Sequence, residues 1–327
     1  MRIKSLITTM IVFICITACS IPRLTLFSDA ADPLKEYTLE GNGSDKILII
    51  TVQGTIYDTP QKGLVRSSPS MVEQVVSQLK KAENDKHIKA LLLKINSPGG
   101  SVTASDILYH EIQSFKEKTG TKILVSMMDV AASGGYYMSL PADIIMAHPT
   151  TITGSVGVIF LRPKASALMD KIGVGMDVIK YGKNKDMGSP FRESTEEEKN
   201  IMQKSVNNFG ERFISLVQKH RKLKEPALGE VSMARVFTAD EALKLGLVDK
   251  IGYISDAIKE AKTLAGIAAD SQIVVYRRTK FSDDNYYNAA GAALEAEHLP
   301  VINIALPDSF NLQAGFYYIW PGAIGSE

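Results

Sequence analysis

The alternation of unbroken apolar runs with segments of helical periodicity constrains the fold of this chain more than any other feature. Two runs, "IKALLLKIN" at 88–96 and "KILVSMMDV" at 122–130, are apolar almost throughout, as strands covered on both faces are. Helices are expected after Ser68, over 102–118 and from Thr195 to about Lys222, and further strands at 46–56 and 175–182. Strands that alternate with helices are joined by right-handed crossovers into a mainly parallel sheet with flanking helices. The sequence therefore predicts an α/β fold.

The composition limits which partners and which catalytic groups the protein can use. The formal net charge is +1, and residues 1–18 hold Arg2 and Lys4 but no acid, so the remainder is close to neutral and gives no reason to expect a nucleic acid as partner. The chain has only two cysteines, Cys15 and Cys19. The body of the protein therefore has no thiol for a disulfide, a metal site or a cysteine nucleophile, and covalent catalysis would need serine, threonine or lysine.

The N-terminus reads as a targeting segment. "MRIKSLITTMIVFICITACSIPR" begins with a short basic region, and its apolar run from Leu6 to Ala18 is shorter than the roughly 20 residues of a spanning helix. Its end, Ile16-Thr17-Ala18-Cys19, resembles the lipobox of bacterial lipoproteins, which implies cleavage before Cys19 and lipidation of that cysteine. We therefore expect a signal peptide over 1–18 and a tether over 19–45. The alternative is an uncleaved, short membrane anchor.

Small residues surround a serine that directly follows the second apolar run. Ser133 lies in "AASGG", where its neighbours leave space around the hydroxyl, as a nucleophile requires. The preceding strand ends in "SPGGS", so both turns meet at the carboxyl edge of the sheet. The Gly134 amide and a glycine amide of the "PGG" turn could together hold an oxyanion. Taken singly, each glycine turn is better explained as a tight crossover with no role in chemistry.

A serine nucleophile needs a base, and the residues leave two kinds of candidate. Among the five histidines, His148 is the one that ends a strand near Ser133. Lys183 and Lys185 lie in "YGKNKDMGSPF", after the expected strand at 175–182. A lysine can act as a base when burial lowers its pKa toward neutrality, although lysines that follow strands are usually solvated.

Several long motifs resemble one peptidase family. "INSPGGSV", "AASGGYYMSLPAD", "TITGSVGVI", "YGKNKDMGSPFR" and "VFTADEALKLGLVD" occur in the order and spacing of the signal peptide peptidase A family, peptidase family S49. These are bacterial Ser-Lys peptidases with a ClpP/crotonase-like fold. The resemblance covers 46–265, which implies a peptidase domain there and a C-terminal extension over 266–327.

The resemblance assigns a role to each matching position. It implies that Ser133 is the nucleophile and that Lys185 is the general base, because the family's lysine directly precedes the "DMGSP"-like segment. Gly100 and Gly134 match the residues whose amides form the oxyanion hole. Ser155 matches the serine that orients the lysine amine. The family chemistry requires neither a metal nor a cofactor.

The resemblance also implies an assembly and a location. The short, single-unit form of the family builds a dome-shaped ring in which the serine and lysine of each site come from adjacent protomers. We therefore expect a homo-oligomeric ring at the exported face of a membrane in the bacterial cell envelope, held by the lipid on Cys19 or by an anchor. Its expected substrates are signal-peptide remnants and unfolded envelope proteins. For the apolar tail "GFYYIWPG" at 315–322, packing at an interface is favoured over lining the interior of the ring.

Three alternatives can be weighed against this hypothesis. A crotonase-type enzyme would act on acyl-CoA, a cytoplasmic metabolite, and the export signal argues against it. A Ser-His-Asp peptidase would depend on His148 rather than on Lys185. A catalytically silent envelope scaffold, or a peptide-binding homologue of the same fold, would have no need to keep Ser133, Lys185 and Ser155 together.

Overall fold

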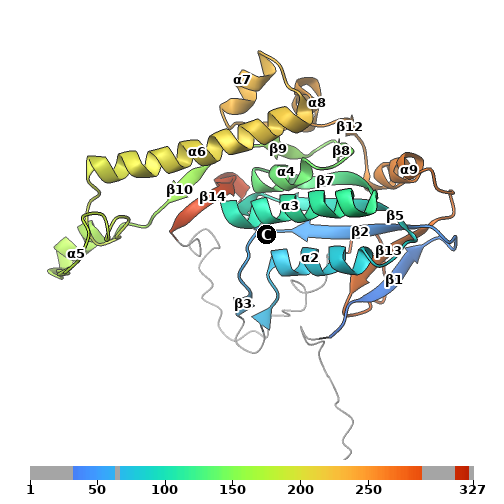
Figure 1. Ribbon diagram of the computed structural model, residues 1–327, viewed down its shortest axis with the longest axis horizontal. Coiled ribbons are helices and arrows are strands. Elements are labelled where there is room, and N and C mark those ends of the chain that lie inside the picture. Colours follow the sequence, from blue (N-terminus) through green and yellow to red (C-terminus); the bar gives the residue numbers. More distant parts are fainter. Residues whose placement is uncertain (1–31, 63–66, 289–313, 324–327) are drawn as a thin grey trace, which may run out of the picture. The chain divides into compact units, whose positions relative to one another are not determined.

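A mainly parallel sheet forms the centre of the molecule (Figure 1), in a computed structural model that describes residues 32–62, 67–288 and 314–323. The strand order is β1-β13-β2-β5-β7-β8-β12, and every neighbouring pair is parallel except the antiparallel pair at the β1 edge. The bounds are Lys35–Glu40 for β1, Gln272–Arg277 for β13, Lys46–Gln53 for β2, Ile88–Ser97 for β5, Lys122–Ala132 for β7, Ile144–Ala147 for β8 and Lys250–Ile251 for β12. The predicted α/β class is confirmed.

Helices pack on both faces of this sheet because its central strands carry apolar side chains in both directions. On β2, Leu48 and Ile50 belong to one core cluster, whereas Ile47 and Ile49 belong to another. The first cluster includes side chains of α2 (Met71–Ala82), α3 (Val102–Thr119) and α6 (Glu196–Arg221), and the second includes side chains of α9 (Ile254–Ala265). Because helices cover both faces of the central strands, the carboxyl ends of β5 and β7 are held in fixed positions.

Strand β7 changes partner along its length. Its residues 124–127 pair with β8, whereas 130–132 pair in parallel with β9 (Ile152–Gly154). Extra residues on β7 form a bulge against β5, where the register slips between Ile95 and Ser97. β9 also pairs in antiparallel fashion with β11 (Val236–Thr238). The residue that follows β7 therefore lies beside the end of β9.

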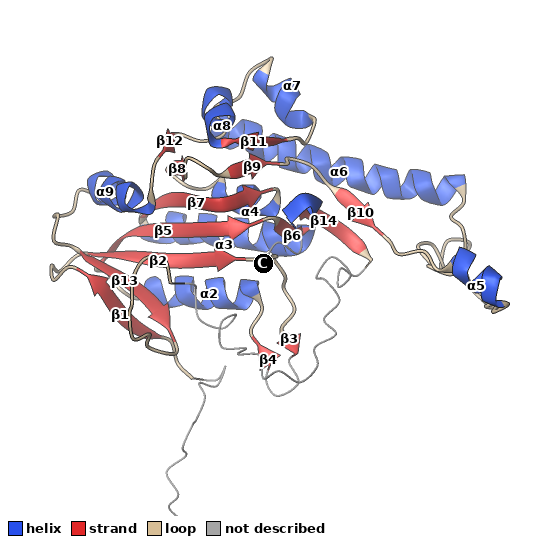
Figure 2. Cartoon of the chain, turned by 180° about the vertical axis from the view of Figure 1, so that it is seen from behind, coloured by secondary structure: helices blue, strands red, loops and turns tan. Residues whose placement is uncertain are grey.

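A second, three-stranded sheet has the order β10-β14-β6 and is antiparallel throughout (Figure 2). Its strands are β10 (Ile159–Leu161), β14 (Gly315–Ile319) and β6 (Gly99–Ser101), and a 3-10 helix, Pro321–Ala323, follows β14. Residues 315–319 of the apolar tail thus form a strand within their own chain. Two short strands, β3 (Gln61–Lys62) and β4 (Ser67–Ser68), pair separately.

Helix caps explain where the helices begin and end. Helix α6 begins after Thr195, as predicted, and α8 (Ala239–Leu245) ends at Gly246, whose φ is 79°. Helix α2 begins after Ser70, so the predicted cap at Ser68 is wrong by two residues. Ser70 has Glu73 three positions later, and the two form reciprocal side-chain and backbone hydrogen bonds, a capping box. A short helix, α7 (Ala227–Ser232), precedes β11.

An arm follows β10 and contains α5 (Ser166–Ile172) and the loops that lead to α6. The strand predicted at 175–182 is wrong, because this segment has no ladder partner and adopts no regular structure. Its side chains Val178, Ile179 and Tyr181 are exposed, Ile179 fully so. Apolar side chains in such a pattern are normally buried, but no other part of the described chain covers them.

The compact unit extends beyond the predicted peptidase domain at both ends. It begins at Leu34, so β1, which falls in the range expected as a tether, is part of it. β13 and β14, from the expected C-terminal extension, are strands of the two sheets. The expected signal peptide and Cys19 lie outside the described residues. Within the described ranges, no helix combines the length and the apolar character needed to cross a membrane.

Candidate active site

Ser133 occupies the turn between β7 and the short helix α4 (Gly134–Ser139), in a strained conformation. Its φ of 51° lies in the left-handed region, which costs a non-glycine residue about 1–3 kcal/mol and is common at active sites. Two backbone hydrogen bonds hold it there: its amide donates to the Gly154 carbonyl at 2.8 Å, and its carbonyl accepts from the Tyr137 amide at 2.8 Å. The side chain is buried, and its Oγ has no hydrogen-bond partner among the described residues. A buried hydroxyl without a partner is available for chemistry.

Glycines allow the turn after β5 to touch the turn after β7. A Cβ on Gly99 would lie 2.0 Å from the Tyr318 carbonyl oxygen and 2.6 Å from the Gly134 amide nitrogen. A Cβ on Gly100 would lie 2.0 Å from the Ile56 carbonyl oxygen. Neither approach is possible for a residue with a side chain. The two turns expected to form an oxyanion hole are therefore in direct backbone contact.

Ser155 lies beside the nucleophile candidate. Ala132 is the register partner of Gly154 in the β7–β9 ladder, so the next residues, Ser133 and Ser155, are neighbours across the two strand ends. Ser155 is also buried and also has a positive φ, 52°, and its amide donates to the Arg235 carbonyl at 2.8 Å. Both serines are thus fixed by their backbones.

Lys185 is in a different part of the chain. It lies in the arm, in a loop whose Pro190 carbonyl accepts a hydrogen bond from the Ala165 amide at the start of α5. Both views draw the arm apart from α4, which follows Ser133 (Figures 1 and 2). Lys185 is exposed, and its ammonium has no ion-pair or hydrogen-bond partner among the described residues. A single chain therefore does not bring Lys185 to the Ser133 hydroxyl.

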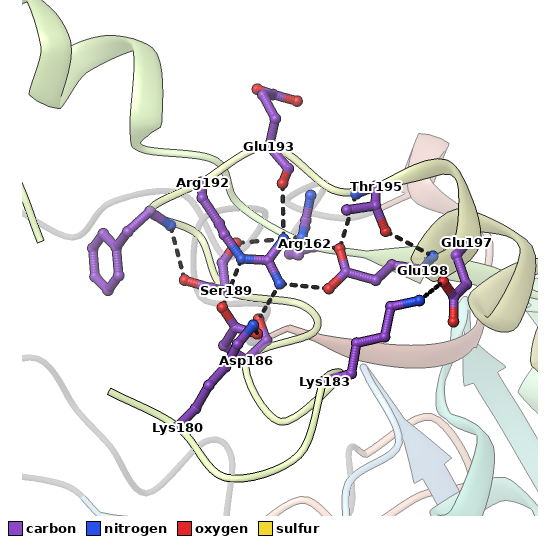
Figure 3. A network of polar contacts seen from close by, with 11 residues as sticks. Arg162, Lys180, Lys183, Asp186, Ser189, Arg192, Glu193, Thr195, Glu197 and Glu198 are labelled. Atoms are coloured by element: carbon purple, nitrogen blue, oxygen red, sulfur yellow. Dashed lines mark hydrogen bonds and ion pairs between the residues drawn. The ribbon is translucent and has the colours of Figure 1, made fainter. Parts of the chain in front are cut away.

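The neighbouring lysine differs from Lys185 in one respect. Lys183 forms an ion pair with Glu197 at the start of α6 (Figure 3). Of the two lysines in "YGKNKD", only Lys185 has an amine without a partner in the described part of the chain. This difference agrees with the choice that the family resemblance implies.

An ionic network fixes the loop that carries Lys185 (Figure 3). Arg192 Nε donates to Asp186 Oδ2 at 2.8 Å, and its Nη1 donates to Glu198 Oε2 at 2.9 Å. The Arg192 guanidinium, followed by Lys180, holds the pKa of Asp186 far below its usual range, and Arg192 lowers the pKa of Glu198 to about 2. Both carboxylates therefore stay charged at any physiological pH. Sequence reasoning missed this network, although the acidic and basic residues flanking "GSPF" were a signal for it.

His148 does not act on Ser133 in this structure. Its Nδ1 hydrogen-bonds the Thr150 hydroxyl at 2.9 Å, and its ring packs edge-on against Tyr253. The partner is a hydroxyl rather than the carboxylate of a Ser-His-Asp triad. Within the described residues, no group of three or more histidine, cysteine, aspartate or glutamate side chains is arranged to hold a metal ion.

Sequence reasoning also missed an aromatic cluster behind the site. Tyr137 of α4 stacks on Tyr318 of β14 with ring centroids 5.0 Å apart, and Phe213 of α6 packs against both rings. The "GFYYIW" pattern marked the tail as apolar, but a strand order cannot be read from one apolar segment. The cluster links α4, which carries Gly134, to β14.

The sequence is similar to a family of known peptidases. A model of Peptidase family S49 matches residues 115–268, and a Clp protease model matches residues 65–156. The putative signal peptide peptidase SppA of Enterococcus faecium is 36% identical over 248 residues, which cover 76% of this chain and 72% of that protein. The chain belongs to the signal peptide peptidase A family, peptidase family S49. It is therefore a serine peptidase, and its sheet has the Clp protease type of fold.

Two further relatives show how this S49 peptidase compares in length. A putative protease of Methanocaldococcus jannaschii is 35% identical over 236 residues, 72% of this chain and 75% of that protein. Protease 4 of Haemophilus influenzae is 32% identical over 265 residues, 80% of this chain but only 42% of that protein. The matched part of the chain thus spans most of the Methanocaldococcus jannaschii protein but less than half of Protease 4.

Proposed function

We propose that the protein is a membrane-associated endopeptidase with a Ser133–Lys185 dyad, which degrades signal-peptide remnants and unfolded polypeptides. The observation that carries this proposal is the state of Ser133. Its hydroxyl is buried without a hydrogen-bond partner among the described residues, its backbone is held at positive φ, and the Gly134 amide follows it directly. Serine nucleophiles need such a hydroxyl next to oxyanion donors.

The proposed chemistry is acyl transfer to water. Neutral Lys185 takes the proton of Ser133 Oγ as the oxygen attacks a peptide carbonyl carbon, and the amides of Gly100 and Gly134 hold the oxyanion. The lysine then protonates the leaving amine, and the C–N bond breaks to leave an ester on Ser133. Water, deprotonated by the same amine, releases the acid and restores the serine. Ser155, the neighbour of Ser133, orients the lysine amine by a hydrogen bond.

A second copy of the chain supplies the lysine in this proposal. A lysine base must be neutral, and desolvation is the physical route to a neutral lysine near pH 7. Lys185 is exposed within its own chain, so the desolvation has to come from another protomer. The arm around it exposes several large apolar side chains, among them Leu168, Ile172, Ile179 and Tyr181, which supports its burial against a neighbour. A ring of such contacts completes one site per protomer.

The membrane association rests on the N-terminal sequence and on the relative named as a signal peptide peptidase. The lipobox-like Ile16-Thr17-Ala18-Cys19 would place the folded unit at the exported face of a membrane, in the bacterial cell envelope. Signal-peptide remnants reach that surface after their precursors are cut. Radiolabelled palmitate in growing cells should enter the wild type but not Cys19→Ala.

The test of the dyad compares four variants of the full chain on a fluorogenic apolar peptide and an unfolded protein. Ser133→Ala and Lys185→Ala should each lose at least about a thousandfold in kcat/KM. Lys183→Ala and His148→Ala are matched controls, and both should stay within a few-fold of wild type. Activity that survives Ser133→Ala or Lys185→Ala, in protein of normal oligomeric state, would refute the proposal.

A further inference from the structure

The bulge in β7 lies directly before Ser133. At the register shift between β5 and β7, one residue of β5, Asn96, faces three residues of β7, 128–130. The extra residues have no partner of their own on β5. β7 also exchanges its other neighbour here, β8 for β9. The segment that carries Ser133 therefore has less regular backbone pairing than the rest of the sheet.

Asn96 spans the bulge from the β5 side. Its side-chain Oδ1 accepts a hydrogen bond from the Val130 amide at 3.0 Å. Its backbone carbonyl accepts from the Gly54 amide, just after β2, at 2.9 Å. The side-chain oxygen thus takes the place that a backbone carbonyl has in a regular ladder, and it connects the bulge to the end of β5.

Two threonines hold the same segment from the β9 side. Thr153 Oγ1 donates to the Ala131 carbonyl at 2.6 Å, two residues before Ser133. The Thr151 hydroxyl donates to the carbonyls of residues 127 and 128, at the start of the bulge. Both threonines are fully buried, and a β-branched side chain has few rotamers. Each hydroxyl therefore has a fixed direction toward the backbone of β7.

The position of Ser133 depends on this contact between β7 and β9. Its amide donates to the carbonyl of Gly154, the residue that follows Thr153. The Thr153 side chain and the Gly154 backbone thus bind successive parts of the last turn of chain before the nucleophile candidate. If the Ala131 carbonyl lost its donor, the end of β7 could move relative to β9, and Ser133 would move with it. A displacement of about 1 Å of a reacting group can lower a rate by about 100-fold.

We propose that Asn96, Thr151 and Thr153 are positioning residues for the peptidase reaction: they hold the bulged end of β7 and thereby aim the Ser133 hydroxyl at the peptide carbonyl. This inference deepens the proposed function and rests on Ser133 as the nucleophile. All three residues lie in "INSPGGSV" and "TITGSVGVI", from which the proposed function uses only one glycine and one serine. Because their bonds are made within the chain, they act on kcat rather than on substrate binding.

Thr153 gives the sharpest test, because two substitutions separate its hydroxyl from its shape. Thr153→Val keeps the shape and removes the donor, and kcat should fall about 10- to 100-fold while KM stays within about threefold of wild type. Thr153→Ser restores the hydroxyl, so its kcat should stay within about threefold of wild type. Thr119→Val is the matched control. It removes a threonine hydroxyl bonded to the Phe115 carbonyl at the end of α3, and should change kcat less than about threefold.

Thr151→Val and Asn96→Leu should show the same fall in kcat at constant KM, since each removes a bond to the bulge. The pH profile of kcat should keep its shape in Thr153→Val, because the hydroxyl acts on the serine rather than on the base. A kcat of Thr153→Val equal to that of wild type would overturn the positioning role. An equal loss in Thr153→Ser would overturn it too, since the loss would then follow the packing of the methyl group.

Hydrogen exchange separates this inference from the proposed chemistry, because it needs no substrate. In the full chain, the amides of residues 128–133 should exchange at least about tenfold faster in Thr153→Val than in wild type, and those of β2 should be unchanged. Equal exchange over 128–133 would refute the hold on β7 even if the dyad stands. Faster exchange together with full activity of Ser133→Ala would confirm the hold but refute Ser133 as the nucleophile that it serves.

Discussion

At the scale of single residues, the site depends on glycines at positions where a side chain would clash with neighbouring backbone atoms. Ser133 is held at positive φ by hydrogen bonds to Gly154 and from Tyr137, and the glycines opposite it are packed against backbone atoms. The motif "AASGG" was sufficient to identify Ser133 as a candidate, because the small residues on both sides of it can be read directly from the sequence. The contact between the Gly99 and Gly134 turns was foreseeable only as a consequence of the parallel sheet.

Gly100→Ala should destabilise the fold as well as disturb the proposed oxyanion hole. Its Cβ would lie 2.0 Å from the Ile56 carbonyl oxygen and 2.6 Å from the Ile56 amide nitrogen, so backbone has to move, at a cost of about 1–3 kcal/mol. Gly175→Ala is the control, because nothing lies within 4 Å of its Cβ position. Chemical unfolding should show a lower free energy of unfolding for Gly100→Ala, and a change of no more than about 0.5 kcal/mol for Gly175→Ala. Equal stability of the two would contradict this packing.

Lys94 gives a prediction about pH. It is buried on β5, where its amine donates to the carbonyls of Tyr286 and Asn288, and burial lowers the pKa of Lys94 to about 8. In the unfolded chain a lysine titrates near 10.4, so between these values only the unfolded state holds the proton. The stability of wild type relative to Lys94→Met should therefore rise with pH from about 8 to about 10.4, by up to about 3 kcal/mol. Urea unfolding of both proteins at pH 7, 8, 9 and 10 measures this change. A difference in free energy of unfolding that stays constant with pH would contradict the prediction.

At the scale of elements, local signals were sufficient for some parts and insufficient for others. The sequence predicted α3 and α6 because caps and helical spacing act within a few residues. Helix α2 begins after Ser70 rather than Ser68 because Ser70 has Glu73 as its capping partner. The strand predicted at 175–182 failed because a strand needs a neighbour, and the chain provides none there. β14 could not be placed, since its partners β6 and β10 are distant in sequence.

The loop with Lys185 should depend on Arg192. Arg192→Ala removes the bonds to Asp186 and Glu198 that fix this loop, and we expect a fall in kcat of about 10- to 100-fold from misplacement of the amine. Lys164→Ala is the matched control in the same arm, because it removes only an exposed ion pair with Glu193. The oligomeric state should stay unchanged in both, and the melting temperature should stay unchanged in Lys164→Ala, whereas Arg192→Ala should lower it because the buried Glu198 carboxylate loses its partner. A normal kcat for Arg192→Ala would mean that the network does not position the lysine.

At the scale of the whole molecule, the proposed nucleophile and the proposed base belong to separate regions of one chain. Ser133, Gly134, Gly100 and Ser155 meet because β5, β7 and β9 end at the same edge. The residues themselves nominated Ser133, Gly134 and a glycine of the "PGG" turn, whereas the family resemblance assigned Gly100 and Ser155. The residues made both Lys183 and Lys185 candidate bases, and only the family resemblance chose Lys185. Its sequence environment gave no sign of whether it meets the serine within a chain or between chains, because that depends on a surface formed only by assembly.

Subunit mixing decides how the dyad is assembled. If each site combines Ser133 of one protomer with Lys185 of the next in a head-to-tail ring, an equimolar mixture of Ser133→Ala and Lys185→Ala, unfolded and refolded together, has an intact pair at about a quarter of its sites. Each variant alone has none. We therefore expect about a quarter of wild-type activity from the mixture, and a loss of that activity on dilution below the concentration at which the ring dissociates. A dyad formed within one chain predicts an inactive mixture, since every chain then lacks one of the two groups.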